Sequence, residues 1–415
     1  MVRTGTAGLG ISGLASTIAN MTMMGKATAS PGGSGMSDYK ALICLFLNGG
    51  CDSNNLLIPI NDHPGRANYD ADRQFVAVSE ADINTAGTAL NVKEVNGDSY
   101  ASNVYGLHPE CQFMASRFNA GQLAMIANCG TLAVPIDPGV SKEEYDRLTK
   151  PIQLFSHSDQ VNEWFSSIPQ NPFISGWAGR IADLFQKAPY PSQGINQGGL
   201  TSMLMSAGGN SDLLVTPGGS VPQYSVSKSG AVSLDGYGTN YGSALSGGVY
   251  RTTSTGQRLN AFEGIMSYEH DHVLEQGHND VMKSARENEG TIGAATAEAD
   301  AISTPTGVNA PTGRHLEDIF LNVYNGRSGT NLTAANQLPG DIRELLIICK
   351  MIAGRKCLGN NRQVFFFNKG GFDNHSDIND NLPGLLRDVD IMVESFMQAM
   401  QAIADVQPDF DINMA

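Results

Sequence analysis

The sequence has no basic stripe and, after its first residues, no long apolar run. Lys and Arg total 26 against 41 Asp and Glu, which gives a net charge of −15. A chain without clustered cations does not attract phosphate backbones or anionic lipids, so we expect neither nucleic acid nor an anionic membrane as a partner. After residue 29 no stretch reaches the roughly 18 apolar residues of a membrane span, so we expect no span in the mature protein.

Three common motifs are also missing. There is no G-x-S-x-G, no Walker loop and no G-x-G-x-x-G after a predicted strand. Those patterns carry the nucleophile of many serine hydrolases and the phosphate-binding turns of nucleotide-binding proteins. Serine hydrolases of that type, nucleoside triphosphatases and dinucleotide-dependent enzymes therefore have no support in the sequence.

The chain has 6 cysteines, and none forms a Cys-x-x-C pair, which argues against a zinc knuckle. If Cys349 and Cys357 share one helix, they lie about 12 Å apart along its axis. A disulfide needs Cα atoms within roughly 7 Å, so this pair is excluded unless Gly354 ends the helix. Cys111 and Cys129 are better candidates for a bridge in an oxidising compartment. Six free buried thiols are the alternative.

The first 29 residues have the character of an export signal. Gly8–Met24 is small and apolar, and Ala27-Thr28-Ala29 is an A-x-A-type cleavage site. The basic start is limited to Arg3, and VRTGTAGLG (2–10) resembles the segment after the twin arginine of a Tat signal. We expect bacterial Tat export to the periplasm or the medium, with a Gly/Ser/Pro linker at 30–37. The alternative is an apolar surface helix.

Apolar runs and helical periodicities together predict an α/β chain. Predicted strands cover Tyr39–Leu47, Gln122–Asn128, Thr201–Ser206, Leu213–Thr216 and Val364–Phe367. Predicted helices cover 109–120, 159–167, 176–185, 257–298 as one or two, 339–353 and 379–404. Strands that alternate with helices favour a parallel sheet. Residues of about 61–106 and 217–313 are expected to be irregular insertions, the second around the predicted 257–298 helices.

Two predicted strands end in the same pattern, Gly-Gly-x-Asp. The first leads into NGGCDSNN (48–55) and the second into NKGGFDNH (368–375). Paired glycines let the backbone turn sharply near a ligand, and open α/β sheets bind ligands at the carboxyl ends of their strands. Asp52, Asp373 and His375 are therefore candidate metal ligands, with the two carboxylates about 4 to 8 Å apart. The alternative for Asp52 is a turn-capping role.

A third polar cluster is FSHSDQ (155–160). Ser156 or Ser158 can act as a nucleophile if a metal lowers the pKa of its hydroxyl, and His157 lies beside both. The alternative is a helix N-cap, with Asp159 in the first turn. If the cluster is catalytic, Ser156 and His157 should border the same crevice as Asp52.

The remaining histidines give a weaker signal. His270, His272 and His278 resemble a cluster, but on a helix positions i and i+2 point about 200° apart, so we expect surface residues. His108, in GLHPE (106–110), precedes a predicted helix and is expected to be structural or to support a site.

These motifs, in this order, resemble the family catalogued as domain of unknown function 1501, Tat-exported bacterial proteins related to the alkaline phosphatase and sulfatase superfamily. The matching pieces are FLNGGCDSNNLLIP (46–59), GLHPE (106–110), LFSHSDQ (154–160), SGWAGRIAD (175–183) and FFFNKGGFDNHSD (365–377). They span about 38–405. The resemblance implies an alkaline phosphatase-like three-layer α/β/α sandwich with a mostly parallel central sheet and a metal-like site at its carboxyl edge.

The resemblance also implies roles for individual residues. Asp52 matches the first acidic ligand, Asp373 with His375 a second ligand group, and Ser156 the motif that supplies the nucleophile, with His157 beside it. Four further residues would support this site: Asn55, His108, Asp159 and Gln160. The metal would be zinc, manganese or calcium, and the substrate a small anionic ester or a sulfated or phosphorylated polymer.

The sequence supports two functional hypotheses. One is an exported metal-dependent hydrolase of phosphate or sulfate esters, and the other is a non-catalytic exported binding or assembly protein that keeps the fold. Family members continue past the last helix into an Asp-His-Gly motif, which this chain, ending at Ala415, does not contain. We therefore expect the 38–405 domain to be incomplete at its C-terminal end and its metal centre to lack ligands.

Overall fold

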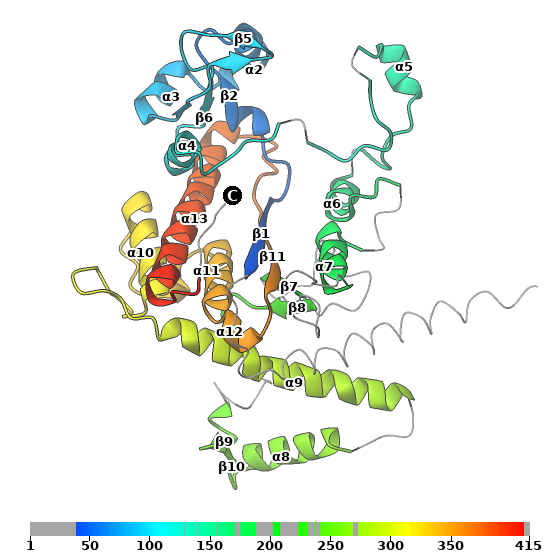
Figure 1. The fold of residues 1–415 in the computed structure, drawn as a ribbon, viewed down its shortest axis with the longest axis vertical. Helices are drawn as coiled ribbons and strands as arrows, with labels where there is room; N and C mark the ends of the chain where they lie inside the picture. The colour runs from blue at the N-terminus through cyan, green and yellow to red at the C-terminus, as the bar shows by residue number, and fades with distance from the viewer. Residues whose placement is uncertain are drawn as a thin grey trace, which may run out of the picture. The chain divides into compact units, whose positions relative to one another are not determined.

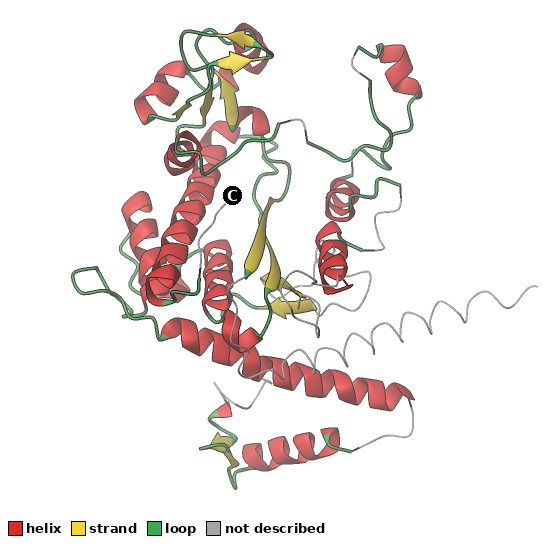
Figure 2. Cartoon of the chain, viewed as in Figure 1, coloured by secondary structure: helices red, strands yellow, loops and turns green. Residues whose placement is uncertain are grey.

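The chain is a mixed α/β protein, shown here by a computed structural model (Figures 1 and 2). The structure describes residues 39–127, 129–137, 139–154, 156–170, 175–187, 202–207, 223–230, 237, 241–268 and 273–410. The expected signal, the linker and the predicted strand at 213–216 lie outside these residues. The chain divides into two compact units. The first draws on Met1–Cys44, Thr131–Ala301 and Lys350–Phe366, and the second on Leu45–Gly130, Ile302–Cys349 and Phe367–Ala415.

The largest described sheet has four strands in the order β1-β11-β7-β8. Their bounds are Lys40–Leu47 (β1), Arg362–Lys369 (β11), Ser202–Ala207 (β7) and Gln223–Val226 (β8). β11 pairs with β7, and β7 with β8, in parallel. Phe365, Phe366 and Phe367 of β11 are all buried, as the interior of a parallel sheet requires. The predicted strands at both Gly-Gly-x-Asp loops, and the one beginning near 201, are confirmed.

The first unit also contains six helices among its described residues. They are α5 (Lys142–Arg147), α6 (His157–Ser166), α7 (Trp177–Lys187), α8 (Ser254–Met266), α9 (Val273–Asp300) and α12 (Arg355–Leu358), with a short hairpin of β9 (Leu245–Ser246) and β10 (Val249–Tyr250). The predicted helical stretch at 257–298 is therefore two helices. α12 packs against α9 at Gly354, where a Cβ would lie only 2.3 Å from the carbonyl oxygen of Ala295. Only glycine permits this approach.

The segment at 61–106 is more ordered than expected. It holds α2 (Arg66–Arg73), α3 (Glu80–Ala86), β3 (Ala89–Leu90), β4 (Glu94–Val95), β5 (Asp98–Ser99) and the start of β6 (Tyr105–Leu107). β6 pairs antiparallel with both β3 and β2 (Leu57–Pro59). Tyr69 and Ile83 of this segment form a small core with Ile58 and Ile60, which precede it. The expectation of an irregular loop was wrong because these elements are too short to show a clear periodicity.

The predicted strand at Gln122–Asn128 is also wrong. Residues 122–127 form no strand, and Asn128 lies outside the described residues. Leu123 and Met125 pack against a core cluster, while the side chain of Ile126 is exposed to solvent. The short apolar run therefore packs part of its side chains against a core without forming a strand.

Four longer helices complete the described part of the second unit. They are α4 (Gln112–Asn119), α10 (His315–Ser328), α11 (Gly340–Ala353), whose end belongs to the first unit, and α13 (Ile378–Val406). α13 packs against both α10 and α4 (Figure 1). The predictions of α11 and α13 are confirmed, whereas no helix was expected at the position of α10. α4 begins at Gln112 rather than at the predicted Pro109.

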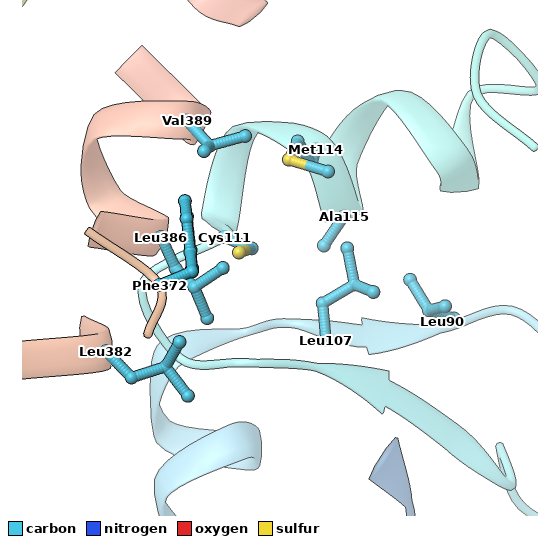
Figure 3. Close-up of a cluster of buried hydrophobic side chains, with 9 residues drawn as sticks. All are labelled: Leu90, Leu107, Cys111, Met114, Ala115, Phe372, Leu382, Leu386 and Val389. Carbon is cyan, nitrogen blue, oxygen red and sulfur yellow. The ribbon is translucent and has the colours of Figure 1, made fainter. Parts of the chain in front are cut away.

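α13 and α4 enclose an apolar cluster that also holds the 369–377 loop in place. Val389 of α13 lies near Met114 of α4, and Phe372 of the loop lies beside Leu386 and Cys111 (Figure 3). Phe372 is buried, so the burial of one large aromatic ring, worth about 2 kcal/mol or more, fixes the middle of this loop.

All six cysteines are free. Cys111 is buried at the start of α4 and Cys129 is exposed, so the expected Cys111–Cys129 bridge is wrong. The alternative of six buried thiols also fails, because Cys129 and Cys357 are both exposed. Cys357 lies on α12 and not on the helix of Cys349.

A buried carboxylate joins three of the helices. Asp390 of α13 is 0% exposed and accepts hydrogen bonds from the backbone N–H groups of Phe113 (2.9 Å) and Met114 (2.8 Å). These donors belong to the first turn of α4, where backbone N–H groups have no partner inside the helix. Arg327 of α10 donates to the same carboxylate at 2.8 Å. Asp390 of α13 therefore caps the N-terminus of α4 and neutralises the Arg327 guanidinium of α10.

We expect Asp390→Asn to destabilise the second unit by about 2–4 kcal/mol, because Arg327 keeps its charge while its buried partner loses its own. Urea unfolding followed by circular dichroism measures the change. Asp146→Asn is the control, since Asp146 forms an exposed ion pair with Lys142 on α5. Equal stability of the two variants would show that Asp390 is not a structural anchor.

Candidate functional site

The two Gly-Gly-x-Asp loops lie against each other in the second unit. Asn48 donates its backbone N–H to the carbonyl of Lys369 at 2.9 Å, and the Asn48 carbonyl accepts from Phe372 at 3.4 Å. Gly49 has a φ of +108°, and a Cβ there would lie 2.7 Å from the backbone nitrogen of Asp373. A side chain at this position would therefore clash with the other loop, which explains the first glycine of NGG.

The second loop is fixed where it leaves the strand. Lys369 is 4% exposed, and its ammonium donates to Asp341 of α11 at 2.6 Å and to Asp388 of α13 at 2.8 Å. These hydrogen bonds outweigh burial and raise the pKa of Lys369, so it remains a cation. A charged lysine between two carboxylates ties the end of β11 to two helices.

Asp52 is paired with a cation from within the second unit. Its carboxylate accepts a hydrogen bond from Arg73 at the end of α2, and both side chains are mostly buried. Among the described residues, no group of three or more His, Cys, Asp or Glu side chains is arranged to hold a metal ion. Asp52 is thus neutralised by a guanidinium in this arrangement.

Asp373 and His375 form a pair at the surface. The Nε2 of His375 lies 2.9 Å from Oδ1 of Asp373. The side chain of His375 is 82% exposed and that of Asp373 is 50% exposed. Solvent screens a pair this exposed, so it contributes little to stability. The pair leaves both side chains accessible to a ligand from solvent.

Ser156 and His157 belong to the first unit, whereas Asp52, Asp373 and His375 belong to the second. Ser156 is the N-cap of α6, and its hydroxyl accepts from the backbone N–H of Asp159 at 3.4 Å. The hydroxyl of Ser158 lies 3.2 Å from the same oxygen. His157 is exposed, and no hydrogen bond joins it to Ser156 in the part of the chain that the structure describes.

Gln160, the other polar residue of this motif, also has a local role. Its side chain donates to Glu163 at 3.1 Å, one turn further along α6. Burial raises the pKa of Glu163, against the effect of this hydrogen bond. The FSHSDQ motif therefore builds a helix start, which agrees with its alternative interpretation, and Phe155 lies outside the described residues.

The N-cap and nucleophile roles of Ser156 predict different results. An N-cap tolerates aspartate, so Ser156→Asp should keep the stability of α6, while Ser156→Ala should cost about 1 kcal/mol. Both variants remove the hydroxyl nucleophile. Thermal unfolding of the two proteins separates the roles, and equal stability of the Ala and wild-type proteins would contradict the cap.

Two of the expected supporting residues, Asn55 and His108, line a cavity in the second unit. Its volume is about 550 Å³, within the range of ligand pockets. Asn55 donates to the carbonyl of Val76 at 2.8 Å and accepts from the hydroxyl of Tyr69 at 2.8 Å. Nδ2 thus holds Val76 directly, while Oδ1 holds Tyr69, whose hydroxyl accepts from the backbone N–H of Val78. The segment 74–78, of which residues 75–78 line the cavity, forms one wall.

His108 is 6% exposed and is held in one orientation. Its Nδ1 accepts from the backbone N–H of Glu110 at 3.2 Å. Burial lowers the pKa of His108, against a smaller opposite effect of Glu110, so the ring is neutral at pH 7. Because Nδ1 accepts, Nε2 carries the ring hydrogen.

Glu110 and Arg387 form a bidentate ion pair beside the histidine. The guanidinium donates from Nε at 2.7 Å and from Nη2 at 2.9 Å. These hydrogen bonds lower the pKa of Glu110, although partial burial opposes the shift. Arg327 also donates to the Glu110 carbonyl at 3.3 Å, which fixes the turn from His108 to α4.

The Glu110 pair predicts a dependence of stability on acid. Since the folded-state pKa of Glu110 is below its ordinary value of about 4.5, its stabilisation is full above that value and is lost as the pH falls through the folded pKa. Glu110→Gln should lower stability at pH 7 and flatten the fall below about pH 4.5. Urea midpoints from pH 2 to 7 measure this, with exposed Glu94→Gln as the control for losing one carboxylate. A parallel pH profile of Glu110→Gln and wild type would contradict the pairing.

Sequence reasoning missed most residues of this cavity. Phe75, Asp82 and Asn379 line it, as does Gln112 at the start of α4. Phe75 begins a short apolar run, 75–78, which gave no sequence signal of a binding site. Of the other histidines, His270 and His272 lie outside the described residues, and the side chain of His278 on α9 is not described.

No protein-family model, curated protein or solved structure matches this chain. None of the helices among the described residues has the length and apolar character needed to cross a membrane.

Proposed function

We propose that this chain is an exported binding protein with the three-layer fold of the family that its motifs resemble. The observation that carries the proposal is the ion pair between Asp52 and Arg73. A guanidinium stays protonated at any physiological pH, so a divalent cation at Asp52 would meet a fixed positive charge. The first ligand expected from the resemblance is therefore engaged by the protein itself.

The remaining candidates are too few for a resident metal. Asp373 and His375 supply two side chains, and both are half or more exposed. A catalytic zinc has three protein ligands and a structural zinc four. The residues present do not fit a zinc, manganese or calcium centre as they are placed, so they support no hydrolytic step at a bound metal. Binding without turnover is the function that this arrangement supports best.

Ester hydrolysis is the second candidate, and the contact between the two loops at Gly49 and Asp373 favours it. In that case Arg73 would have a second role. A planar guanidinium binds the oxygens of a phosphate or sulfate ester in a bidentate manner. Arg73 would then leave Asp52 and hold the anionic group of the ester.

Calorimetric titration of zinc, manganese and calcium distinguishes the two functions. For a binding protein we expect weak affinity, unchanged by Asp373→Asn, and no turnover of p-nitrophenyl phosphate or sulfate. If Asp52 is a metal ligand, Arg73→Gln should strengthen metal binding, because it removes a competing cation. Arg66→Gln on the same helix is the matched control, since Arg66 pairs with Asp70.

Tight metal binding that is lost with Asp373→Asn, together with metal-dependent turnover, would replace the binding function with hydrolysis.

A further inference from the structure

The cavity of the second unit has walls from four separate segments. They are the 74–78 segment, α3, the turn from His108 to the start of α4, and the first turns of α13. The Asp390 and Glu110 contacts hold two of these walls together. Asn55 fixes the third through Val76, so the cavity is built before any ligand arrives.

One polar group in this cavity has no partner. Nε2–H of His108 donates to nothing among the described residues, although the side chain is only 6% exposed. Because Nε2 has no partner among these residues and yet is not fully buried, it reaches solvent, and a ligand can supply its acceptor. His108 lines the cavity, which makes the cavity the place from which an acceptor can come.

An exposed aromatic ring lies at the wall of the same cavity. Phe75 is 85% exposed, and its carbonyl accepts from the side chain of Asn379 at 2.9 Å. This bond fixes the backbone that carries the ring. A large apolar ring left in water beside a cavity offers a flat face for a ligand.

The charge of the lining selects among ligands. Asp82 and Glu110 contribute carboxylates, and neither Lys nor Arg occurs among the described residues that line the cavity. An anionic ligand would be repelled. Glu110 is already neutralised by Arg387, whereas Asp82 accepts a hydrogen bond from the Ser79 hydroxyl and keeps its charge. A neutral ligand with hydroxyl groups can both accept and donate here.

We propose that this cavity binds a neutral saccharide. One sugar face stacks on Phe75, a ring or hydroxyl oxygen accepts from Nε2 of His108, and other hydroxyls donate to the carboxylates. This inference rests on the proposed binding function and names the class of its ligand. The carbon-bound hydrogens of a sugar face suit the electron-rich face of an aromatic ring.

Ligand-observed NMR on the full chain tests the inference. The neutral probes are maltose, cellobiose, lactose and N,N′-diacetylchitobiose, with glucose 6-phosphate as an anionic probe and glucosamine as a cationic one. We expect saturation transfer to at least one neutral disaccharide and none to glucose 6-phosphate. Calorimetry with that disaccharide should show about tenfold weaker binding for Phe75→Ala and wild-type affinity for Phe75→Trp.

Two further variants complete the test. His108→Phe keeps a ring of similar size but removes the donor, and it should also weaken binding about tenfold. Tyr268→Ala removes an exposed aromatic ring of the first unit and should change nothing. Because Phe75 is exposed, its substitution tests the cavity even if His108→Phe fails to fold.

Binding of none of the neutral probes, preference for the charged ones, or equal affinity of Phe75→Ala and Tyr268→Ala would each overturn the saccharide proposal. These outcomes leave the absence of ester turnover untouched. Hydrolysis of an ester, in contrast, would remove the proposed binding function while the saccharide site could still stand.

Discussion

The carboxylate of Asp390 is the constraint on which the second unit depends. It is fully buried, and removing a carboxylate from water is costly unless strong partners replace the water. Here those partners are two backbone N–H groups at the start of α4 and the guanidinium of Arg327. The same group therefore satisfies a helix end and pairs with a partly buried cation. Moving α4 relative to α13 would remove two of these donors, and moving α10 would separate Arg327 from the carboxylate.

The spacing along α13 extends this constraint to the candidate site. Arg387, Asp390 and Glu394 lie three and four residues apart in turn, which places them on one helix face. Arg387 holds the side chain of Glu110, while Asp390 and Glu394 hold Arg327, which in turn contacts the Glu110 backbone. A single face of one helix thus orients the turn that contains His108. The position of this histidine is set by ion pairs with α13, one of which includes Glu110 of the cavity lining.

Elements with a long apolar pattern could be predicted from the sequence. β11 has three consecutive phenylalanines, and the apolar periodicity of α11 and α13 persists over several turns, so burial and local pattern agree. α10 was missed although its residues Phe320 and Leu321 are buried. Its charged first turn and the Gly-rich sequence around it hid the apolar face. The false strand at 122–127 shows the converse, because a short apolar run indicates burial but not a pairing strand.

The candidate site was predictable where the backbone determines it. Paired glycines after two strands indicated that two loops meet, and the contact of Gly49 with Asp373 agrees with that geometry. The partner of Asp52 could not be found in this way. Arg73 is 21 residues away on a short helix, and no local pattern connects a carboxylate with a cation at that separation. Sequence reasoning identifies the charge to be neutralised, whereas only the fold decides whether a metal or an arginine neutralises it.

The same distinction explains why the cavity escaped notice. Its two recognised residues, Asn55 and His108, occur in motifs that the sequence singled out for another reason. Phe75 and Asn379 are separated by 304 residues and meet through one backbone carbonyl. A binding surface of this kind has no sequence motif, because its residues lie close together in the fold but have no regular spacing along the chain. The unpaired Nε2–H of His108 becomes informative only once its surroundings are known, since a donor lacks a partner solely in relation to the groups that the fold brings near it.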